Sequence, residues 1–266
     1  METNKTAIVT GAASGLGLEL ALLLAKDSYD LILIDIDKNN LEKAQQKIAS
    51  VYKVATQLLV KDLSQPNVAE AIYQAVNGRP IDVLINNAGF GLFGTFSDTD
   101  WERESQMLNL HIMTTTHLTK LLLNDMVERG TGKILNVSSL AAFQPGPLMA
   151  LYYASKAYIL SFSEAIANEL KGTGVTVTVL CPGQTDTGFQ DVVSDSASDS
   201  SSDNKIGFNM ASPNDVARYG YKAMKRGKTV AIPGRINKLL SIIHRFVTRS
   251  MATKIVRNIQ EKNRDC

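Results

Sequence analysis

Short apolar runs alternate with segments of helical periodicity along most of this chain, and this alternation limits the folds open to it. Runs typical of buried strands lie at residues 5–10, 31–34, 54–60, 81–85, 133–137, 175–180 and 230–233. Segments with helical spacing lie at residues 18–25, 39–51, 66–76, 100–128, 151–170 and 213–226. Strands joined through helices run parallel, and the helices cover both faces of their sheet. We therefore predict one doubly wound α/β domain over residues 1–234, with a seven-stranded, mostly parallel sheet.

Composition narrows the class of protein. The 266 residues include 28 Lys and Arg against 26 Asp and Glu. The net charge of +2 does not indicate the excess of basic residues that nucleic-acid binding needs. The two cysteines, Cys181 and Cys266, imply no disulfide framework, which fits a reducing compartment. Neither a signal peptide nor a long apolar span is found. We expect a cytoplasmic protein that does not cross a membrane and does not bind nucleic acid.

A glycine-rich turn joins the first predicted strand to the first helix. Glycines have no β-carbon, so the backbone can approach a pyrophosphate, while the helix N-terminus offers amides and partial positive charge. The same glycines could serve only the packing of the helix, and the turn by itself leaves both interpretations open. The candidate cofactor-binding residues here are Thr10, Gly11, Ser14, Gly15, Leu16 and Gly17.

Asp35 ends the second predicted strand. There its carboxylate could accept hydrogen bonds from the ribose hydroxyls of an adenosine, and it would repel a 2′-phosphate. Ser14 and Ile36 stand where an Arg or Lys could have bound that phosphate, although Lys38 is close in sequence. We therefore expect NAD(H) in preference to NADP(H).

Further candidate cofactor-binding residues follow the next two strands. Small and amide side chains at the end of the fourth strand can pass close to an adenine ribose and brace the neighbouring strands. Asp62 could accept from the adenine amino group or could cap the turn that follows it, and the sequence leaves both open. The candidates are Asp62, Leu63, Asn87, Ala88 and Gly89.

Tyr152 and Lys156 lie four residues apart on a predicted helix and therefore share a face. An ammonium group beside the phenol would favour its ionised form, and at about 4 Å it supplies roughly the 4 kcal/mol that brings the tyrosine pKa near neutrality. Tyr221 and Lys225 repeat this spacing, but only the first pair has Ser139 thirteen residues upstream of its tyrosine. We expect Tyr152 to act as an acid or base.

Together these residues resemble the short-chain dehydrogenase/reductase family over residues 5 to about 233. The elements that carry the resemblance are Thr10 to Gly17, Asp62, Asn86 to Gly89, Asn109, Ser139, Tyr152, Lys156, Pro182, Gly183 and Thr187. The resemblance implies a Rossmann-type fold, a nicotinamide cofactor and hydride transfer between that cofactor and a secondary alcohol or ketone. It also implies a homodimer or homotetramer.

The resemblance assigns roles to individual residues. Asn109 would anchor a water in a proton relay, Ser139 would bind the substrate carbonyl, and Tyr152 would pass the proton. Lys156 would hold the nicotinamide ribose and lower the pKa of Tyr152, and Thr187 would touch the nicotinamide amide. Tyr152 and Lys156 therefore also count as cofactor-binding, together with Pro182, Gly183 and Thr185.

The histidines and the apolar residues near these segments are less specific. His111, His117 and His244 do not stand at metal-ligand spacing, so we predict no metal and interpret all three as structural or exposed. Apolar residues that flank the catalytic segments could line a pocket for a hydrophobic alcohol or ketone. They are Phe90, Phe93, Phe96, Phe143, Pro145, Pro147, Leu148 and Met149.

Two segments depart from the family pattern. Residues 191–204 are a Ser/Asp run that cannot bury apolar area, and it is either a surface insertion or, as we favour, part of a substrate lid at about 188–212. Residues 235–266 form a basic, helical tail. Its apolar face could lie on an anionic membrane or pack against the domain or a second copy, and we favour packing.

The alternative function is a dinucleotide-binding sensor or scaffold that does not turn over, with the tail as its contact to a partner or membrane. The combined presence of Asn109, Ser139, Tyr152 and Lys156 argues against it, because a sensor needs no proton relay. An oxidoreductase acting on a small-molecule alcohol or ketone is therefore the function that the sequence favours.

Overall fold

The structure is a computed structural model, and it describes residues 5–76, 78–185, 211–243 and 246–262. Its centre is a seven-stranded sheet in the order β3-β2-β1-β4-β5-β6-β7, with every neighbouring pair parallel. The strands are β1 (Thr6–Thr10), β2 (Asp30–Asp35), β3 (Thr56–Val60), β4 (Val83–Asn86), β5 (Gly132–Val137), β6 (Val175–Leu180) and β7 (Val230–Ala231). The predicted doubly wound α/β fold is confirmed.

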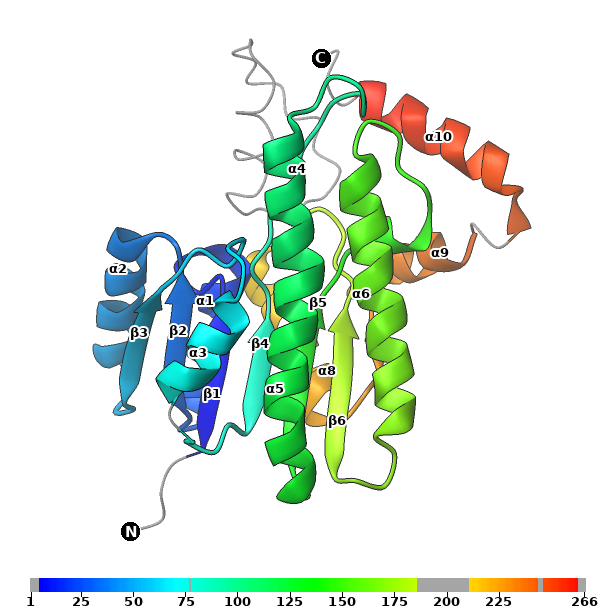
Figure 1. Cartoon of the computed structure of the whole chain (residues 1–266). Helices are drawn as coiled ribbons and strands as arrows, with labels where there is room; N and C mark the ends of the chain where they lie inside the picture. The colour runs from blue at the N-terminus through cyan, green and yellow to red at the C-terminus, as the bar shows by residue number, and fades with distance from the viewer. Residues whose placement is uncertain (1–4, 77, 186–210, 244–245, 263–266) are drawn as a thin grey trace.

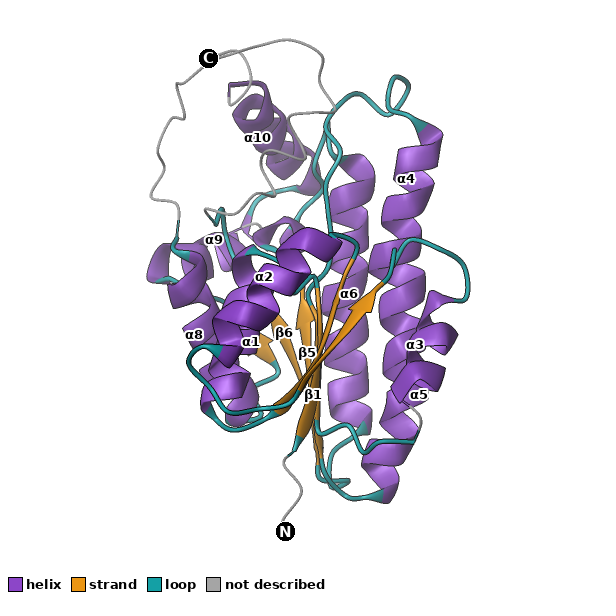
Figure 2. Cartoon of the chain, turned by 90° about the vertical axis from the view of Figure 1, so that its left-hand side faces the viewer, coloured by secondary structure: helices purple, strands orange, loops and turns teal. Residues whose placement is uncertain are grey.

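Helices cover both faces of the sheet (Figures 1 and 2). One face carries α1 (Gly15–Lys26), α2 (Lys38–Ala49) and α8 (Pro213–Lys225). The other carries α3 (Val68–Val76), α4 (Trp101–Leu108), the π-helical turn η1 (Asn109–Thr114), α5 (Thr115–Glu128) and α6 (Ala150–Glu169). Successive strand residues point to opposite faces, so β1 sends Val9 into one apolar core and Ile8 into the other. Because both faces are buried at the centre of the sheet, β1, β2 and β4 are nearly continuous apolar runs, whereas β3 at the edge is only half-buried.

The sheet order changes direction between β1 and β4. β1 pairs with β2 on one side and with β4 on the other, so the connections after these strands diverge. In open parallel sheets, ligands bind outside the carboxyl ends of the strands at such a point. Thr10 and Asn86 end β1 and β4 there, which brings the glycine turn and the amide-rich turn after β4 together.

The segment predicted as one helix at residues 100–128 is a continuous helical run with a change of winding in its middle. Between α4 and α5, the turn η1 is π-helical. A π-turn widens the helix and is common at functional sites. Sequence periodicity did not reveal it.

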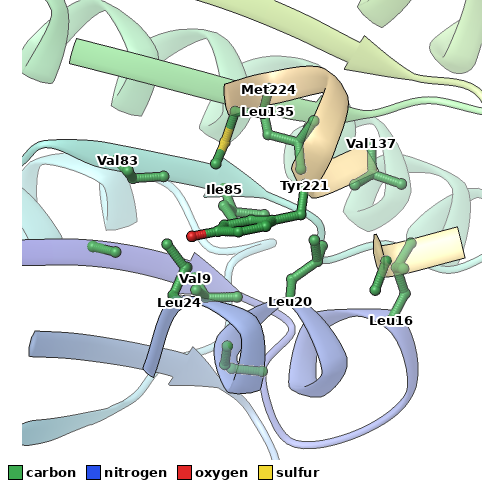
Figure 3. Close-up of a cluster of buried hydrophobic side chains, with 14 of the residues drawn as sticks. Val9, Leu16, Leu20, Leu24, Val83, Ile85, Leu135, Val137, Tyr221 and Met224 are labelled. Atoms are coloured by element: carbon green, nitrogen blue, oxygen red, sulfur yellow. The ribbon is translucent and has the colours of Figure 1, made fainter. Parts of the chain in front are cut away.

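Tyr221 belongs to the apolar core and not to a second reactive site. Its ring is 6% exposed and packs among side chains of α1 and the sheet (Figure 3). Its hydroxyl donates to Asp27 Oδ2 at 2.9 Å, and Lys225 Nζ lies 2.5 Å from the same oxygen. The repeated Tyr-x-x-x-Lys spacing therefore fastens α8 to α1.

The basic tail forms two helices, α9 (Arg235–Ile243) and α10 (Arg249–Lys262). One face of α10 packs on the domain through Ala252 and Val256, and Gln260 Nε2 donates to the Tyr153 hydroxyl at 2.9 Å. Other apolar side chains of the tail are exposed. Within the described ranges, no helix has the length and apolar character needed to span a bilayer. The predicted lid lies outside the described residues except for positions 211 and 212, and Thr187 also lies outside them.

Replacing Tyr221 by Phe should lower the free energy of unfolding by about 1 kcal/mol, because it removes one partly buried hydrogen bond and keeps the ring. Urea denaturation measures this. The matched control is Tyr52→Phe, because no hydrogen bond of the Tyr52 hydroxyl is found in the described part of the chain, and its effect should stay within about 0.5 kcal/mol. Equal losses in the two variants would contradict the role given to Tyr221.

Candidate active site

Asn87 ties the glycine turn to the end of β4. Its Nδ2 donates to the carbonyl oxygens of Thr10 and Gly11 at 3.0 and 3.1 Å. The backbone amides of Asn87 and Ala88 donate to Thr10 Oγ1 at 2.9 and 3.1 Å, and that hydroxyl donates to the Ile85 carbonyl at 3.2 Å. The turn is therefore held rigidly against the neighbouring strand.

Two glycines of this turn have no room for a side chain. Gly11 has a φ of +66°, and a β-carbon on Gly17 would lie 1.9 Å from the Gly11 carbonyl oxygen. The glycines are thus required for packing, which the sequence left open, and the close packing brings the N-terminus of α1 to the sheet edge. The Ser14 side chain does not cap α1, so it accepts no amide of the first helical turn.

Asp35 is fixed against the same turn. Its Oδ2 accepts from the Ala13 amide at 2.9 Å, and its Oδ1 accepts from the Asp37 amide at 3.1 Å. The nearby Lys38 lies 3.9 Å from Glu42 across an exposed helix face. The carboxylate therefore stands at the end of β2 beside the glycine turn, where the sequence predicted it.

Asp62 caps the turn that follows it, which is one of the two roles that the sequence left open. Its carboxylate accepts from the Ser64 amide at 2.9 Å, the Ser64 hydroxyl at 2.7 Å and Gln65 Nε2 at 2.8 Å. The pKa of Asp62 is lowered because these hydrogen bonds outweigh the effect of burial. Leu63 is buried, and its carbonyl accepts from the Thr114 hydroxyl at 2.8 Å. An adenine contact at either residue stays a prediction.

A buried amide network fixes the two strands that lead into the site. Asn86 Nδ2 donates to Asn136 Oδ1 at 2.9 Å and to the Thr119 hydroxyl at 3.1 Å. Asn136 Nδ2 donates to the Ser163 hydroxyl at 2.9 Å. This network joins β4, β5, α5 and α6, so the elements that carry the candidate residues are rigidly related.

Ser139, Tyr152 and Lys156 come together at the carboxyl end of β5. Ser139 caps the short helix η2 (Leu140–Phe143), and its hydroxyl is hydrogen-bonded to the Tyr152 side chain. Lys156 Nζ lies 5.6 Å from the centre of the Tyr152 ring and donates to the Val137 carbonyl at 3.2 Å. The Ser138 hydroxyl also donates to the Lys156 carbonyl at 2.7 Å, which fastens α6 to β5.

Burial controls the protonation of this pair. It raises the pKa of Tyr152 to about 12, against the opposing effect of the Ser139 hydrogen bond. It lowers the pKa of Lys156 to about 8, so the ammonium form still predominates at pH 7. In the protein alone, burial and the neighbouring Ser139 and Tyr153 set the Tyr152 pKa, so the lowering by Lys156 that we expected stays a prediction.

The structure places His111, not Asn109, beside Tyr152. The His111 ring is 1% exposed and meets the Tyr152 ring edge-on, with centroids 6.0 Å apart. Asn109 instead lines a surface hollow with Gln65 and His117, because two residues along a helix turn by about half a revolution. The relay role of Asn109 therefore stays a prediction, and His111, which we interpreted as structural or exposed, is buried against the Tyr152 ring.

A helical pattern in the sequence could have identified His111. Met107, His111, Leu118 and Leu122 are spaced by four, seven and four residues, and all are buried. This spacing defines the inward face of a helix, and Asn109 does not lie on it. Within the described residues, no group of three His, Cys, Asp or Glu side chains could hold a metal.

The segment after β6 borders the same site. The Pro182 carbonyl accepts from the Leu140 amide at 2.9 Å, and the Thr185 hydroxyl donates to the Gly183 carbonyl at 3.1 Å. A β-carbon on Gly183 would lie 2.9 Å from Asn237 of α9. The segment that holds Pro182, Gly183 and Thr185 therefore lies beside the Ser139 loop. Thr187 lies outside the described residues.

Comparisons with known proteins agree with this geometry. The family model for short chain dehydrogenase matches residues 5–198. The ketoacyl reductase HetN of Nostoc sp. is 37% identical over 183 residues, which is 68% of this chain and 63% of HetN. The very-long-chain 3-oxoacyl-CoA reductase of Anas platyrhynchos is 36% identical over 182 residues, 66% of this chain and 58% of that protein. The chain thus spans less than two thirds of each relative.

One solved structure resembles the whole arrangement. It is a short-chain dehydrogenase from Sphingobium yanoikuyae in complex with NADPH, with a TM-score of 0.80 and 26% sequence identity. The match covers 91% of each chain, so it extends well beyond the residues that the curated relatives align. The fold and the order of the elements that build the candidate site are shared with that protein.

Proposed function

Because this chain belongs to the short-chain dehydrogenase family of nicotinamide-dependent oxidoreductases, we propose that it transfers a hydride between the cofactor and a ketone or secondary alcohol. The observation that carries the proposal is the meeting of Ser139, Tyr152 and Lys156 at the carboxyl edge of the sheet. This edge also holds the glycine turn and Asp35. A phenol, a hydroxyl and an ammonium beside a dinucleotide cradle are the parts that carbonyl reduction needs.

The residues at this edge fit a nicotinamide dinucleotide. The close packing at Gly11 and Gly17 holds the N-terminus of α1 at the sheet edge, and the Ser14 side chain does not cap its amides, so they are available to a pyrophosphate. Asp35 would hold the adenosine ribose, and Lys156 would hold the nicotinamide ribose. The cofactor supplies the hydride when it is bound.

The protein's own groups handle the proton. Tyr152 keeps its proton at neutral pH, since burial raises its pKa to about 12, and it is therefore ready to protonate a carbonyl oxygen as that oxygen gains negative charge. Ser139 donates a hydrogen bond to the same oxygen. The Lys156 charge stabilises Tyr152 once the proton has left. Tyr152 and Lys156 are therefore in the protonation states that reduction of a carbonyl requires.

The substrate that we propose is a carbonyl on an apolar chain. Phe90 lies beside the site, with its ring 6.3 Å from His111 and the Arg103 guanidinium stacked over it at 4.7 Å. The names of the two curated relatives describe reductases of oxoacyl or ketoacyl groups. A homodimer or homotetramer remains our proposal for the assembly. The non-catalytic sensor is the rival function, and turnover distinguishes the two.

Replacing Tyr152 by Phe should reduce turnover by a factor of about 10² to 10⁴, because the proton donor is lost, while NADH binding stays nearly unchanged. NADH oxidation across a panel of hydrophobic ketones measures turnover, and NADH fluorescence measures binding. Tyr221→Phe is the matched control, since it removes the other hydroxyl with the same spacing to a lysine. A fully active Tyr152→Phe variant would falsify the assignment, whereas no turnover by the wild type on any ketone or alcohol would favour the sensor.

Wild-type protein should bind NADH more tightly than NADPH, because the Asp35 carboxylate repels a 2′-phosphate. Asp35→Asn removes this charge but can still accept from the Ala13 amide, so it should narrow the preference without unfolding the turn. Titrations of both cofactors followed by fluorescence measure the affinities, with Asp37→Asn as a neighbouring charge control. A wild-type preference for NADPH would refute the role of Asp35.

A further inference from the structure

His111 presents one bare nitrogen to the interior of the proposed site. The ring is held on η1 between Phe90 and Tyr152. Its Nε2 is buried and has no hydrogen-bond partner among the described residues. An unpaired polar atom in a protein interior is costly, which makes it a pointer to function.

The neighbouring hydroxyl fixes the tautomer of His111. Ser155 Oγ donates its single hydrogen to the Tyr152 carbonyl at 2.8 Å. In its 2.9 Å contact with His111 Nδ1 the serine oxygen must therefore accept, so Nδ1 carries the hydrogen. Burial, and secondarily the Lys156 charge, hold the pKa of His111 well below its usual range, so the ring is neutral. Its Nε2 accordingly carries a lone pair.

The buried Lys156 ammonium lies close to His111 Nε2. A β-carbon on Gly89 would lie 2.6 Å from His111 Nε2 and 3.4 Å from Lys156 Nζ. The two nitrogens are therefore no farther apart than the sum of these distances, about 6 Å, across the bare edge of Gly89. A span of this size can be bridged by one water that hydrogen-bonds to both groups.

We propose that His111 is a positioning residue that accepts a hydrogen bond from the Lys156 ammonium, directly or through one water, and so keeps it charged beside Tyr152. The inference rests on the proposed oxidoreductase function and gives His111 the water-anchoring role first assigned to Asn109. The other titratable group packed against the ring is Tyr152 of α6. Arg103 lies farther away, across the ring of Phe90.

The proposal gives a sign for the pH dependence. Without the acceptor, the Lys156 ammonium is less stable, so a smaller positive charge remains near Tyr152 and the Tyr152 pKa rises. Alcohol oxidation needs Tyr152 without its proton. Loss of the acceptor should therefore move the acidic limb of the oxidation profile to higher pH.

Three variants of His111 test this. His111→Leu and His111→Asn lack an acceptor at the Nε2 position, and each should lower kcat by about ten- to hundredfold and shift the acidic limb upward. His111→Gln can place its amide oxygen there and should restore both the rate and the limb. KM for the cofactor should stay unchanged in all three. Equal losses in the three variants with an unmoved limb, or a fully active His111→Leu, would overturn the proposal.

A second readout does not depend on turnover. Nitrogen-15 NMR of histidine-labelled protein, with His111→Leu to assign the signal, should show a neutral ring protonated at Nδ1 from pH 6 to pH 9, because the ring pKa lies well below its ordinary value. A ring protonated at Nε2 would overturn the inference. If NMR showed the Nδ1-protonated ring but the wild type turned over no substrate, the proposed function would be wrong. The assignment of the His111 tautomer would still be correct.

The tail carries a second, independent observation. Nine of its large apolar side chains are exposed, and together they form what we call the tail surface: Ile236, Leu239, Leu240, Ile242, Ile243, Phe246, Met251, Ile255 and Ile259. Phe246 and Ile236 are the most open, at 82% and 74%. Figure 1 shows α9 and α10 at one side of the sheet, near its carboxyl edge. Exposed apolar side chains gathered in one short segment point to an interaction site.

Charge identifies the kind of partner. The described part of the tail carries the cations Arg235, Lys238, Arg249, Lys254, Arg257 and Lys262. Its one described acid, Glu261, lies 2.7 Å from Arg257 and is paired with it. A second copy would bring positive charge against positive charge, whereas anionic lipid headgroups complement it. We infer that the tail surface docks on an anionic membrane, while the opposite face of α10 packs on the domain through Ala252 and Val256.

Co-sedimentation of the full chain with vesicles tests this inference. Vesicles containing phosphatidylglycerol should bind the protein, salt should weaken the binding, and pure phosphatidylcholine vesicles should bind it poorly. The double variant Phe246→Ser and Ile255→Ser should lose binding. The control Val51→Ser removes an apolar side chain that is 66% exposed after α2, and it should bind normally. Absence of binding to either kind of vesicle would refute membrane docking. So would a dimer, seen by sedimentation velocity, that the double variant abolishes.

Discussion

Lys156 carries a charge into the protein interior, and much of the candidate site follows from the need to accommodate it. The residue is 5% exposed, and burying an ammonium is costly unless acceptors surround it. The Val137 carbonyl supplies one acceptor at 3.2 Å, and His111 Nε2 lies close to the same ammonium. Desolvation lowers the Lys156 pKa to about 8 and raises that of Tyr152 to about 12, so both groups hold their protons at neutral pH. This is the state in which a phenol can protonate a carbonyl.

Environment, not spacing, separates the two Tyr-x-x-x-Lys pairs of this chain. Tyr221 and Lys225 both contact Asp27, whose carboxylate at the end of α1 satisfies them. Tyr152 and Lys156 have no such carboxylate among their described contacts and instead face Ser139 and the sheet edge. An acidic partner makes one pair structural. In the other pair, neutral donors and acceptors stand where that carboxylate would be. Tyr152 is therefore left able to move a proton.

The alternation of strands and helices was enough to predict the parallel fold, because burial on both faces leaves nearly continuous apolar runs in the central strands. The meeting of Ser139, Tyr152 and Lys156 was also predictable, since strand ends converge at one edge. The pKa of Tyr152 was not, because desolvation depends on packing that no local pattern reports. Asn109 was assigned through the family resemblance and its relay role stays a prediction, whereas the inward face shared by Met107 and His111 could have identified His111. The division at residue 234 and the lid stay predictions.

The central claim is that burial keeps the Tyr152 proton in place until the nicotinamide cofactor is bound. Tyrosinate absorbance of the wild type minus that of Tyr152→Phe, followed as the pH is raised, tests it directly. Without cofactor, we expect no difference signal up to about pH 10, where an ordinary tyrosine ionises. With saturating NAD⁺, the signal should appear at a clearly lower pH, because the cation stabilises the phenolate. The same midpoint with and without NAD⁺, or ionisation near neutrality in the protein alone, would contradict the account.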